Sequence, residues 1–303
     1  MSKKILITGG SGLVGSRLTE LLLGQGHEVR HLSRRSGDKG DIKVFQWDIK
    51  KGTIQDGALD GVDAVIHLAG AGVADEKWTK ERKKEILESR TKSTELLYDK
   101  IKELDNKPAS FISASAIGYY GYDNGGQSQK EGSRFGDDFL ATVTKRWEEE
   151  IDKIEELGLR VVKLRIGIVL ATGGGAYVEL SKPIKMGFGA PLGSGDQYMS
   201  WIHLEDLCNM FTTAMEDETY QGTYNAVAPN PVTNREMTKK IAKSLNKPCF
   251  LPAVPGFVLK LIVGEMASML MGSNKVSSEK IQSAGFSFQF EQLEPALAQL
   301  AKQ

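Results

Sequence analysis

The fold is decided by one stretch near the start of the chain, Ile5-Leu6-Ile7-Thr8-Gly9-Gly10-Ser11-Gly12-Leu13-Val14-Gly15. A short apolar strand ends there in glycines spaced by three, and leucines at helical spacing follow. Gly9 permits a tight turn, Gly12 lets the backbone approach a pyrophosphate, and Gly15 lets helix and strand pack closely. The phosphates would lie at the helix N-terminus, which favours anions. We therefore predict a dinucleotide site over residues 8–15, with a purely structural glycine turn as the alternative.

Composition excludes several other classes of protein. The 303 residues carry 39 Lys and Arg against 39 Asp and Glu, so no whole-chain field attracts nucleic acid or an anionic membrane. Cys208 and Cys249 lie far apart and the four histidines are scattered, which predicts free thiols and no metal. No apolar stretch reaches bilayer length, and because Met1-Ser2-Lys3-Lys4 leads into a predicted strand we expect no secretory signal there. We expect a cytoplasmic protein with a small-molecule ligand, and neither a nucleic-acid nor a membrane partner.

Strands alternate with helices through the first half of the chain. The predicted strands are residues 3–8, 28–32, 44–47, 64–68, 110–113 and 161–164. This alternation is typical of an α/β fold, a doubly wound parallel sheet of the Rossmann type with both faces covered. We assign residues 1–165 to this domain, with a return strand near 223–228.

The composition and the pattern of predicted elements change after residue 165. Glycine and proline clusters replace the regular alternation, so residues 166–303 are predicted to form a smaller, interleaved substrate lobe. Its final segment, residues 250–303, is apolar and helical in pattern, with a stripe of methionines near residue 269. Such a stripe indicates packed core or a subunit contact, with a flexible lid over an apolar substrate as the alternative, so a homodimer is one expected state.

The end of the second strand decides which nucleotide binds. A carboxylate there would accept hydrogen bonds from the ribose of NAD, and this chain has Ser33-Arg34-Arg35 instead. Arg34 lies about twenty residues after the glycine turn, and a guanidinium can bind a 2′-phosphate through two hydrogen bonds. We therefore predict NADP(H), with exposed loop charges as the alternative.

Three other segments are predicted to contact the cofactor. Trp47-Asp48 follows the third strand and is placed to reach the adenine, although Trp47 could only cap the core. The run Leu68-Ala69-Gly70-Ala71 follows the fourth strand, where small residues allow close passage of a ribose; His67 before it fits a buried core histidine equally well. Arg90 ends a charged helix segment that should flank the nicotinamide, and it could pair with a carboxylate of the substrate or of the protein.

Longer motifs carry a family resemblance that covers nearly the whole chain. They are Thr8 to Gly15, His67 to Asp75 with Trp78, Ser89-Arg90, Phe111 to Gly121, Gly136 to Ala141 with Trp147-Glu148, Pro191 to His203, Tyr224 to Asn234 and Gly264 to Ala267. With these motifs the chain resembles an extended short-chain dehydrogenase/reductase, and more narrowly the atypical epimerase-family oxidoreductases with their extra C-terminal segment. The resemblance implies a Rossmann-type fold and a nicotinamide cofactor, and it names no substrate.

The resemblance also implies a catalytic set, and one member is missing here. The parent superfamily uses a serine after the fifth strand and a tyrosine four residues before a lysine, which together exchange a proton while hydride moves. Ser115 matches the serine and Lys145 the lysine, but Ala141 stands where the tyrosine belongs. Proton transfer through this tyrosine is therefore not possible in this chain. Ser115 could also simply satisfy the strand end.

Other residues could replace the missing phenol. Tyr119 and Tyr120 follow Ser115 on a loop at the carboxyl end of the sheet, and either one could donate the proton or merely close the pocket. Lys145 could bind the nicotinamide ribose without a tyrosine. Glu148 could act as an acid or base, or form half of an ion pair.

Three functions remain open on the sequence alone. The first is an NADP(H)-dependent oxidoreductase or epimerase-like enzyme acting on a small polar metabolite. The second is a catalytically silent NADPH-binding regulator, for which Ala141 would record the loss of catalysis. The third is a nucleotide-sugar epimerase, which Ala141 disfavours.

Overall fold

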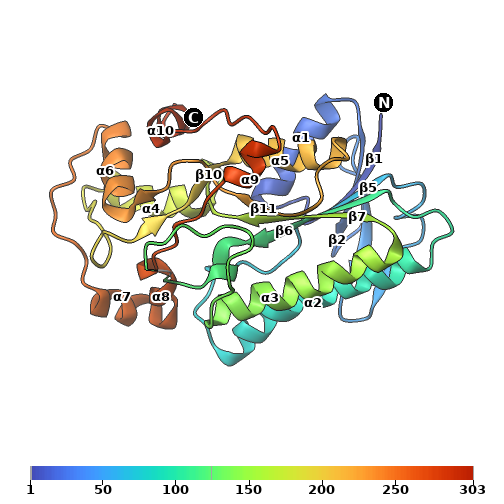
Figure 1. The fold of residues 1–303 in the computed structure, drawn as a ribbon, viewed down its shortest axis with the longest axis horizontal. Helices are drawn as coiled ribbons and strands as arrows, with labels where there is room; N and C mark the ends of the chain where they lie inside the picture. Colours follow the sequence, from blue (N-terminus) through green and yellow to red (C-terminus); the bar gives the residue numbers. More distant parts are fainter. Residues whose placement is uncertain (1, 124, 303) are drawn as a thin grey trace.

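A parallel sheet forms the centre of the computed structural model, which describes residues 2–123 and 125–302 (Figure 1). Across these residues the sheet has eight strands, in the spatial order β11 (Gly222–Ala226), β7 (Arg160–Ile166), β6 (Ser110–Ala116), β5 (Ala64–His67), β1 (Lys4–Thr8), β2 (Glu28–Ser33), β3 (Lys43–Asp48) and β4 (Thr53–Ile54). Neighbouring strands are parallel except β3 and β4, which pair antiparallel. The predicted doubly wound parallel sheet is confirmed.

The chain reverses its direction across the sheet between β1 and β5. From β1 it moves outward through β2 and β3, and it then returns to β5 and moves the other way through β6 and β7. In open parallel sheets of this kind, ligands bind at the carboxyl ends of the strands where the order reverses. The glycine turn follows β1 and the run Leu68–Ala71 follows β5, so the topology brings these two predicted cofactor segments together.

Two layers of helices cover the sheet. Helices α1 (Leu13–Gly24) and α5 (Leu204–Glu216) pack against each other on one face, and α2 (Lys80–Lys102) and α3 (Phe139–Asp152) pack on the other (Figure 1). The central strand β1 is apolar from Ile5 to Ile7 because both of its faces are buried; all three of these residues are inaccessible to solvent. The short helices η1 (Ile117–Tyr120) and η2 (Lys153–Leu157) follow β6 and α3.

The second lobe is built from short elements, some of which share an apolar core of their own. Its strands are β8 (Ile168–Leu170) beside β10 (Trp201–His203), and β9 (Tyr198–Met199) beside β12 (Val232–Thr233). Its helices are α4 (Gly175–Lys185), α6 (Asn234–Ser244), α7 (Gly256–Val263), η3 (Gly264–Met266), α8 (Ala267–Met271), α9 (Glu279–Ser283) and α10 (Leu293–Leu300). None of the helices in residues 2–123 and 125–302 is both long and apolar enough to span a bilayer.

The two lobes are interleaved along the chain. Strand β11 joins the main sheet beside β7, close to the predicted return strand. Helix α5 also belongs to the first lobe, because it packs on α1, whereas the predicted boundary at residue 165 places it in the second. The Asp206 carboxylate on α5 accepts hydrogen bonds from the amides of Gln289 (2.7 Å) and Phe290 (3.0 Å), which ties the C-terminal segment to this helix.

Candidate functional site

The glycine turn after β1 lies directly against the loop after β5. Gly9 has a φ of +71°, and a Cβ built on it would lie 3.0 Å from the Leu68 carbonyl carbon. Thr8 Oγ1 accepts hydrogen bonds from the amides of Leu68 and Ala69, both at 3.1 Å, and shares a 2.7 Å hydrogen bond with His67 Nδ1. The Thr8 side chain therefore holds turn and loop together at the switch point.

Helix α1 packs so closely against the glycine turn that only glycine fits at position 15, in the first turn of the helix. A Cβ on Gly15 would lie 2.3 Å from Gly9 O and 2.7 Å from Gly10 Cα. A Cβ on Gly10 would lie 2.5 Å from the His31 ring, whose burial lowers its pKa to about 4. In dinucleotide-binding motifs, the third glycine allows this close packing of the helix against the strand.

The N-terminus of α1 lacks a side-chain cap. Gly12 occupies the N-cap position and has no side chain to accept the amides of the first turn. Side chains cap α2, α3, α5 and α6 (Thr79, Asp138, His203 and Thr233), whereas α4 has Gly174 at its N-cap and lacks a side-chain cap as α1 does. Ser11 and Gly12 are exposed, so the amide groups of α1 face the carboxyl end of the sheet, where a phosphate group fits.

Arg34 and Arg35 follow β2 on the surface. Both side chains are exposed, and neither forms an ion pair with a carboxylate of the described chain. The Arg34 carbonyl accepts a 3.2 Å hydrogen bond from Gln46 Nε2, which fixes its backbone beside β3, and Ser33 before it is half-buried. Both guanidinium groups are therefore available to a ligand at the end of β2.

Trp47 and Asp48 have structural contacts of their own. Trp47 is 6% exposed and belongs to the main core. The Asp48 carboxylate accepts hydrogen bonds from the amides of Lys50 (2.9 Å) and Lys51 (3.1 Å) and so closes the turn between β3 and β4. The predicted adenine contact of these two residues stays a prediction.

His67 and Arg90 both lie beside the loop after β5. His67 is fully buried, and burial together with the charge of Arg90 lowers its pKa to about 3, so the ring is neutral. Arg90 Nη1 donates to the carbonyls of Ala71 (3.0 Å) and Ile86 (2.9 Å), and its guanidinium lies over the Trp147 ring. Burial and the nearby Arg82 lower the pKa of Arg90 to about 10. Within residues 2–123 and 125–302, Arg90 forms no ion pair, and no carboxylate contributes to the shift of its pKa, so its charge is not offset by an acidic side chain.

Ser115 heads a buried polar network at the carboxyl end of β6. Its hydroxyl donates a 2.5 Å hydrogen bond to Glu148 on α3. Arg165, the residue beside Ser115 on β7, donates to both carboxylate oxygens of Glu148, from Nε at 2.8 Å and from Nη2 at 2.7 Å. Burial opposes the charge on Arg165, but the hydrogen bonds and ion pair with Glu148 outweigh it, so the pKa of Arg165 lies above its ordinary value. The network fixes the Ser115 hydroxyl.

The two tyrosines of η1 differ in their surroundings. Tyr120 Oη donates to Asn225 Oδ1 (2.6 Å) and accepts from Arg165 Nη1 (3.0 Å), and burial raises the pKa of Tyr120 to about 12. Tyr119 is half-buried, and the Arg165 guanidinium lies 3.5 Å from the centre of its ring. Only Tyr119 combines access to solvent with a neighbouring cation.

Lys145 lies outside this network. Its ammonium group is 3.6 Å from Glu149 and lies over the Phe135 ring, and the side chain is 42% exposed. Ala141, four residues earlier, is fully buried. The structure thus brings Ser115 together with Glu148 and Arg165, and it does not bring Lys145 to Ser115.

Sequence reasoning missed Arg165 and Asn225. Arg165 lies in the buried strand β7, where a charged side chain requires a partner. This requirement is the signal in the sequence that could have identified Arg165. Asn225 gives no such signal, because its role depends on β11 pairing with β7.

Comparison with known proteins identifies the family. Residues 5–226 match the NAD dependent epimerase/dehydratase family, and residues 254–300 match a domain of unknown function, DUF1731. The chain belongs to the epimerase family. The resemblance seen in the sequence motifs, with the extra C-terminal segment, is therefore confirmed.

Relatives of this epimerase-family protein match it from end to end. The Bacillus subtilis epimerase family protein YfhF is 35% identical over 98% of this chain and 97% of its own length. The Arabidopsis thaliana protein SDR39U1 homolog, chloroplastic, is 36% identical over 97% of this chain and 85% of its own. The crystal structure of human SDR39U1 with NADPH has a TM-score of 0.90, 31% identity and 99% coverage of both chains. Since one relative is named chloroplastic, the expected cytoplasmic location stays a prediction.

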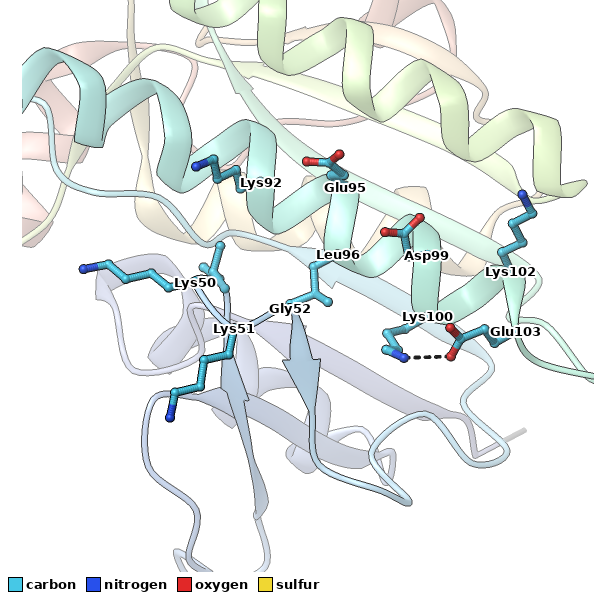
Figure 2. Close-up of a pocket in the computed structure, with 11 residues that line it drawn as sticks. Lys50, Lys51, Gly52, Lys92, Glu95, Leu96, Asp99, Lys100, Lys102 and Glu103 are labelled. Carbon is cyan, nitrogen blue, oxygen red and sulfur yellow. Dashed lines mark hydrogen bonds and ion pairs between the residues drawn. The ribbon is translucent and has the colours of Figure 1, made fainter.

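The epimerase-family chain also carries an open groove of about 750 Å³ between the β3–β4 hairpin and α2 (Figure 2). Its charged walls are formed by Lys50, Lys51, Lys92, Lys100 and Lys102 with Glu95, Asp99 and Glu103. The groove includes neither the glycine turn nor Ser115 and its partners. It is a solvated surface of mixed charge next to the Asp48 turn.

Proposed function

We propose that this protein binds NADP(H) at the switch point between β1 and β5 and acts as an oxidoreductase on a small polar metabolite. The observation that carries the cofactor assignment is the uncapped N-terminus of α1, held against β1 by glycines whose Cβ positions are filled by backbone atoms. These residues fit a dinucleotide, and a protein with the same fold over 99% of the chain was crystallised with NADPH. Gly9 to Gly15 would hold the pyrophosphate, and Leu68 to Ala71 would border the adjoining riboses.

Arg34 is proposed to select NADP(H) over NAD(H). For Arg34→Ala we expect NADPH binding to weaken by about 10- to 100-fold, because one or two hydrogen bonds between charged groups are lost. NADH binding should change little. Calorimetric titration of both nucleotides checks this, with Arg134→Ala as a matched control at another exposed arginine. Equal affinity of the unaltered protein for NADPH and NADH would refute the assignment.

The polar network is proposed to position the substrate. When bound, the nicotinamide supplies or accepts the hydride, and the protein must handle the proton. Ser115 donates its own proton to Glu148, so Ser115 Oγ is left to accept a hydrogen bond from a substrate hydroxyl. Glu148 acts as a positioning residue, since Arg165 fixes both its oxygens. Arg90, with its unpaired charge, favours a polar or anionic substrate.

Tyr119 is proposed as the proton donor in place of the phenol missing at Ala141. We expect Tyr119→Phe to lower kcat by about 100-fold or more, the range seen when a general acid is removed. Tyr120→Phe should leave kcat within a few-fold, because its hydroxyl already bonds Asn225 and Arg165. That variant should instead lose about 1–3 kcal/mol of stability from the partners left unpaired. Steady-state kinetics and thermal unfolding separate the two effects, and full activity in Tyr119→Phe would exclude this phenol.

The function itself is tested by turnover. The protein is incubated with NADPH and fractions of a metabolite extract, and consumption of NADPH is followed together with the appearance of a reduced product. Turnover that disappears in Ser115→Ala supports the oxidoreductase. Tight NADPH binding without turnover on any fraction contradicts it and supports a regulator.

A further inference from the structure

Exposed apolar side chains gather on the second lobe. Across residues 2–123 and 125–302, seven large apolar side chains are exposed, and only Phe135 lies in the first lobe. The other six, which we call the apolar patch, are Met186, Phe188, Phe250, Phe257, Leu261 and Ile262. Single exposed apolar residues are ordinary, whereas a group on one part of the surface marks a contact with another molecule.

Two chain segments bring the apolar patch together. Val254 N donates to Pro191 O at 2.8 Å, and Gly193 N donates to Val254 O at 2.9 Å. Cys249 Sγ lies 3.6 Å from Gly189 O. These contacts align residues 189–193 with 249–254, so Phe188 and Phe250 flank the same junction. Helix α7 follows directly, and in Figure 1 it lies at the edge of the molecule away from the N-terminus.

Helix α7 is apolar on both its inner and its outer side. Leu259 is 6% exposed and faces the protein, and Val263 packs into the apolar cluster around Trp78. Phe257 and Leu261, four residues apart and therefore on one side of the helix, are 74% and 82% exposed. The described chain leaves this outer side uncovered.

The charges around the apolar patch that lack an ion-pair partner are positive. Residues 179–196 and 245–265 carry three carboxylates, and each has a partner: Glu179 pairs with Lys182, Asp196 with Arg235 and Glu265 with Lys83. Lys185, Lys247 and Lys260 are exposed and form no ion pair with the described part of the chain. Apolar side chains on a helix next to lysines are typical of segments that lie in the interface of an anionic membrane.

We propose that the apolar patch docks this protein on the surface of an anionic lipid bilayer, with Phe257 and Leu261 in the interface and the lysines against the headgroup phosphates. A symmetric contact between two copies would bring the same three unpaired lysines into one interface, where the neighbouring carboxylates already have partners within their own chain. The net charge of the whole chain is zero and does not show the local excess of unpaired lysines, so composition alone predicts no membrane partner.

Sedimentation with lipid vesicles tests the proposal. The full chain is mixed with vesicles of phosphatidylcholine alone and of phosphatidylcholine with phosphatidylglycerol. We expect binding to the anionic vesicles at least tenfold stronger than to the neutral ones, and weaker binding as salt is raised. Equal or absent binding to the two kinds of vesicle overturns the proposal.

Matched variants locate the surface. Phe257→Ser with Leu261→Ser should reduce binding at least tenfold, and Lys247→Glu with Lys260→Glu should do the same. Phe135→Ser, and Lys102→Glu with Lys107→Glu near the C-terminal end of α2, are exposed controls away from α7 and should bind like the unaltered protein. Circular dichroism confirms that each variant is folded. If sedimentation velocity shows a dimer that Phe257→Ser dissociates while vesicle binding is unchanged, the patch is an interface between copies and the proposal is wrong.

Discussion

Gly15→Ala is expected to abolish NADP(H) binding at concentrations that saturate the unaltered protein. The added methyl group would lie 2.3 Å from Gly9 O and 2.7 Å from Gly10 Cα, and both are backbone atoms that cannot rotate away. Helix α1 must therefore move off β1, which misaligns the amide groups at its N-terminus. Loss of two charge-assisted hydrogen bonds corresponds to at least about a 100-fold weaker Kd. Calorimetric titration with NADPH measures this directly.

The same helix offers a matched control. Gly24 lies at the other end of α1, and a Cβ there meets no atom within 4 Å. Gly24→Ala should leave NADPH affinity unchanged and raise stability by about 0.5–1 kcal/mol, because alanine has the higher helix propensity. Gly15→Ala should instead lose stability through overpacking, by about 1–3 kcal/mol. Unaltered NADPH affinity in Gly15→Ala would show that the ligand does not use this turn.

The cofactor half of the site could be predicted from sequence because its requirements are local. Gly9, Gly12 and Gly15 follow one another within seven residues of chain, and their spacing indicates which turn must form. The strand pattern then fixes the switch point, since apolar runs buried on both faces imply a parallel sheet. The structure adds the atoms that make each glycine necessary.

The proton-handling half could not be predicted in the same way because its partners come from distant segments. Ser115 was found by its place just after the predicted strand at residues 110–113, but its partner depends on which side of α3 faces the sheet. Glu148 lies on that buried side, whereas Lys145 lies at its edge and reaches solvent. Arg165 reaches Glu148 only because the register of β6 and β7 places it beside Ser115. Pairing register and helix rotation are tertiary properties that a single sequence does not state.

Arg165→Met is expected to lower the free energy of unfolding by about 3–5 kcal/mol, the range for breaking a buried ion pair by removing one partner. Glu148 is only 5% exposed, and it would lose both hydrogen bonds from the guanidinium while its charge stayed buried. The Tyr120 hydroxyl and the Glu131 carbonyl would each lose a donor as well. Chemical denaturation monitored by circular dichroism gives the difference.

Two further variants show whether the loss of stability in Arg165→Met comes from the Glu148 carboxylate that is left buried without a partner. Arg165→Met combined with Glu148→Leu should recover most of the lost stability, because an apolar pair of similar volume can replace a buried ion pair at little net change. Arg146→Met on the same helix removes an exposed arginine 3.7 Å from Glu149 and should change stability by less than about 0.5 kcal/mol. If Arg165→Met were as mild as Arg146→Met, the network would not hold Glu148 in place, and the positioning of Ser115 by Glu148 would have to be abandoned.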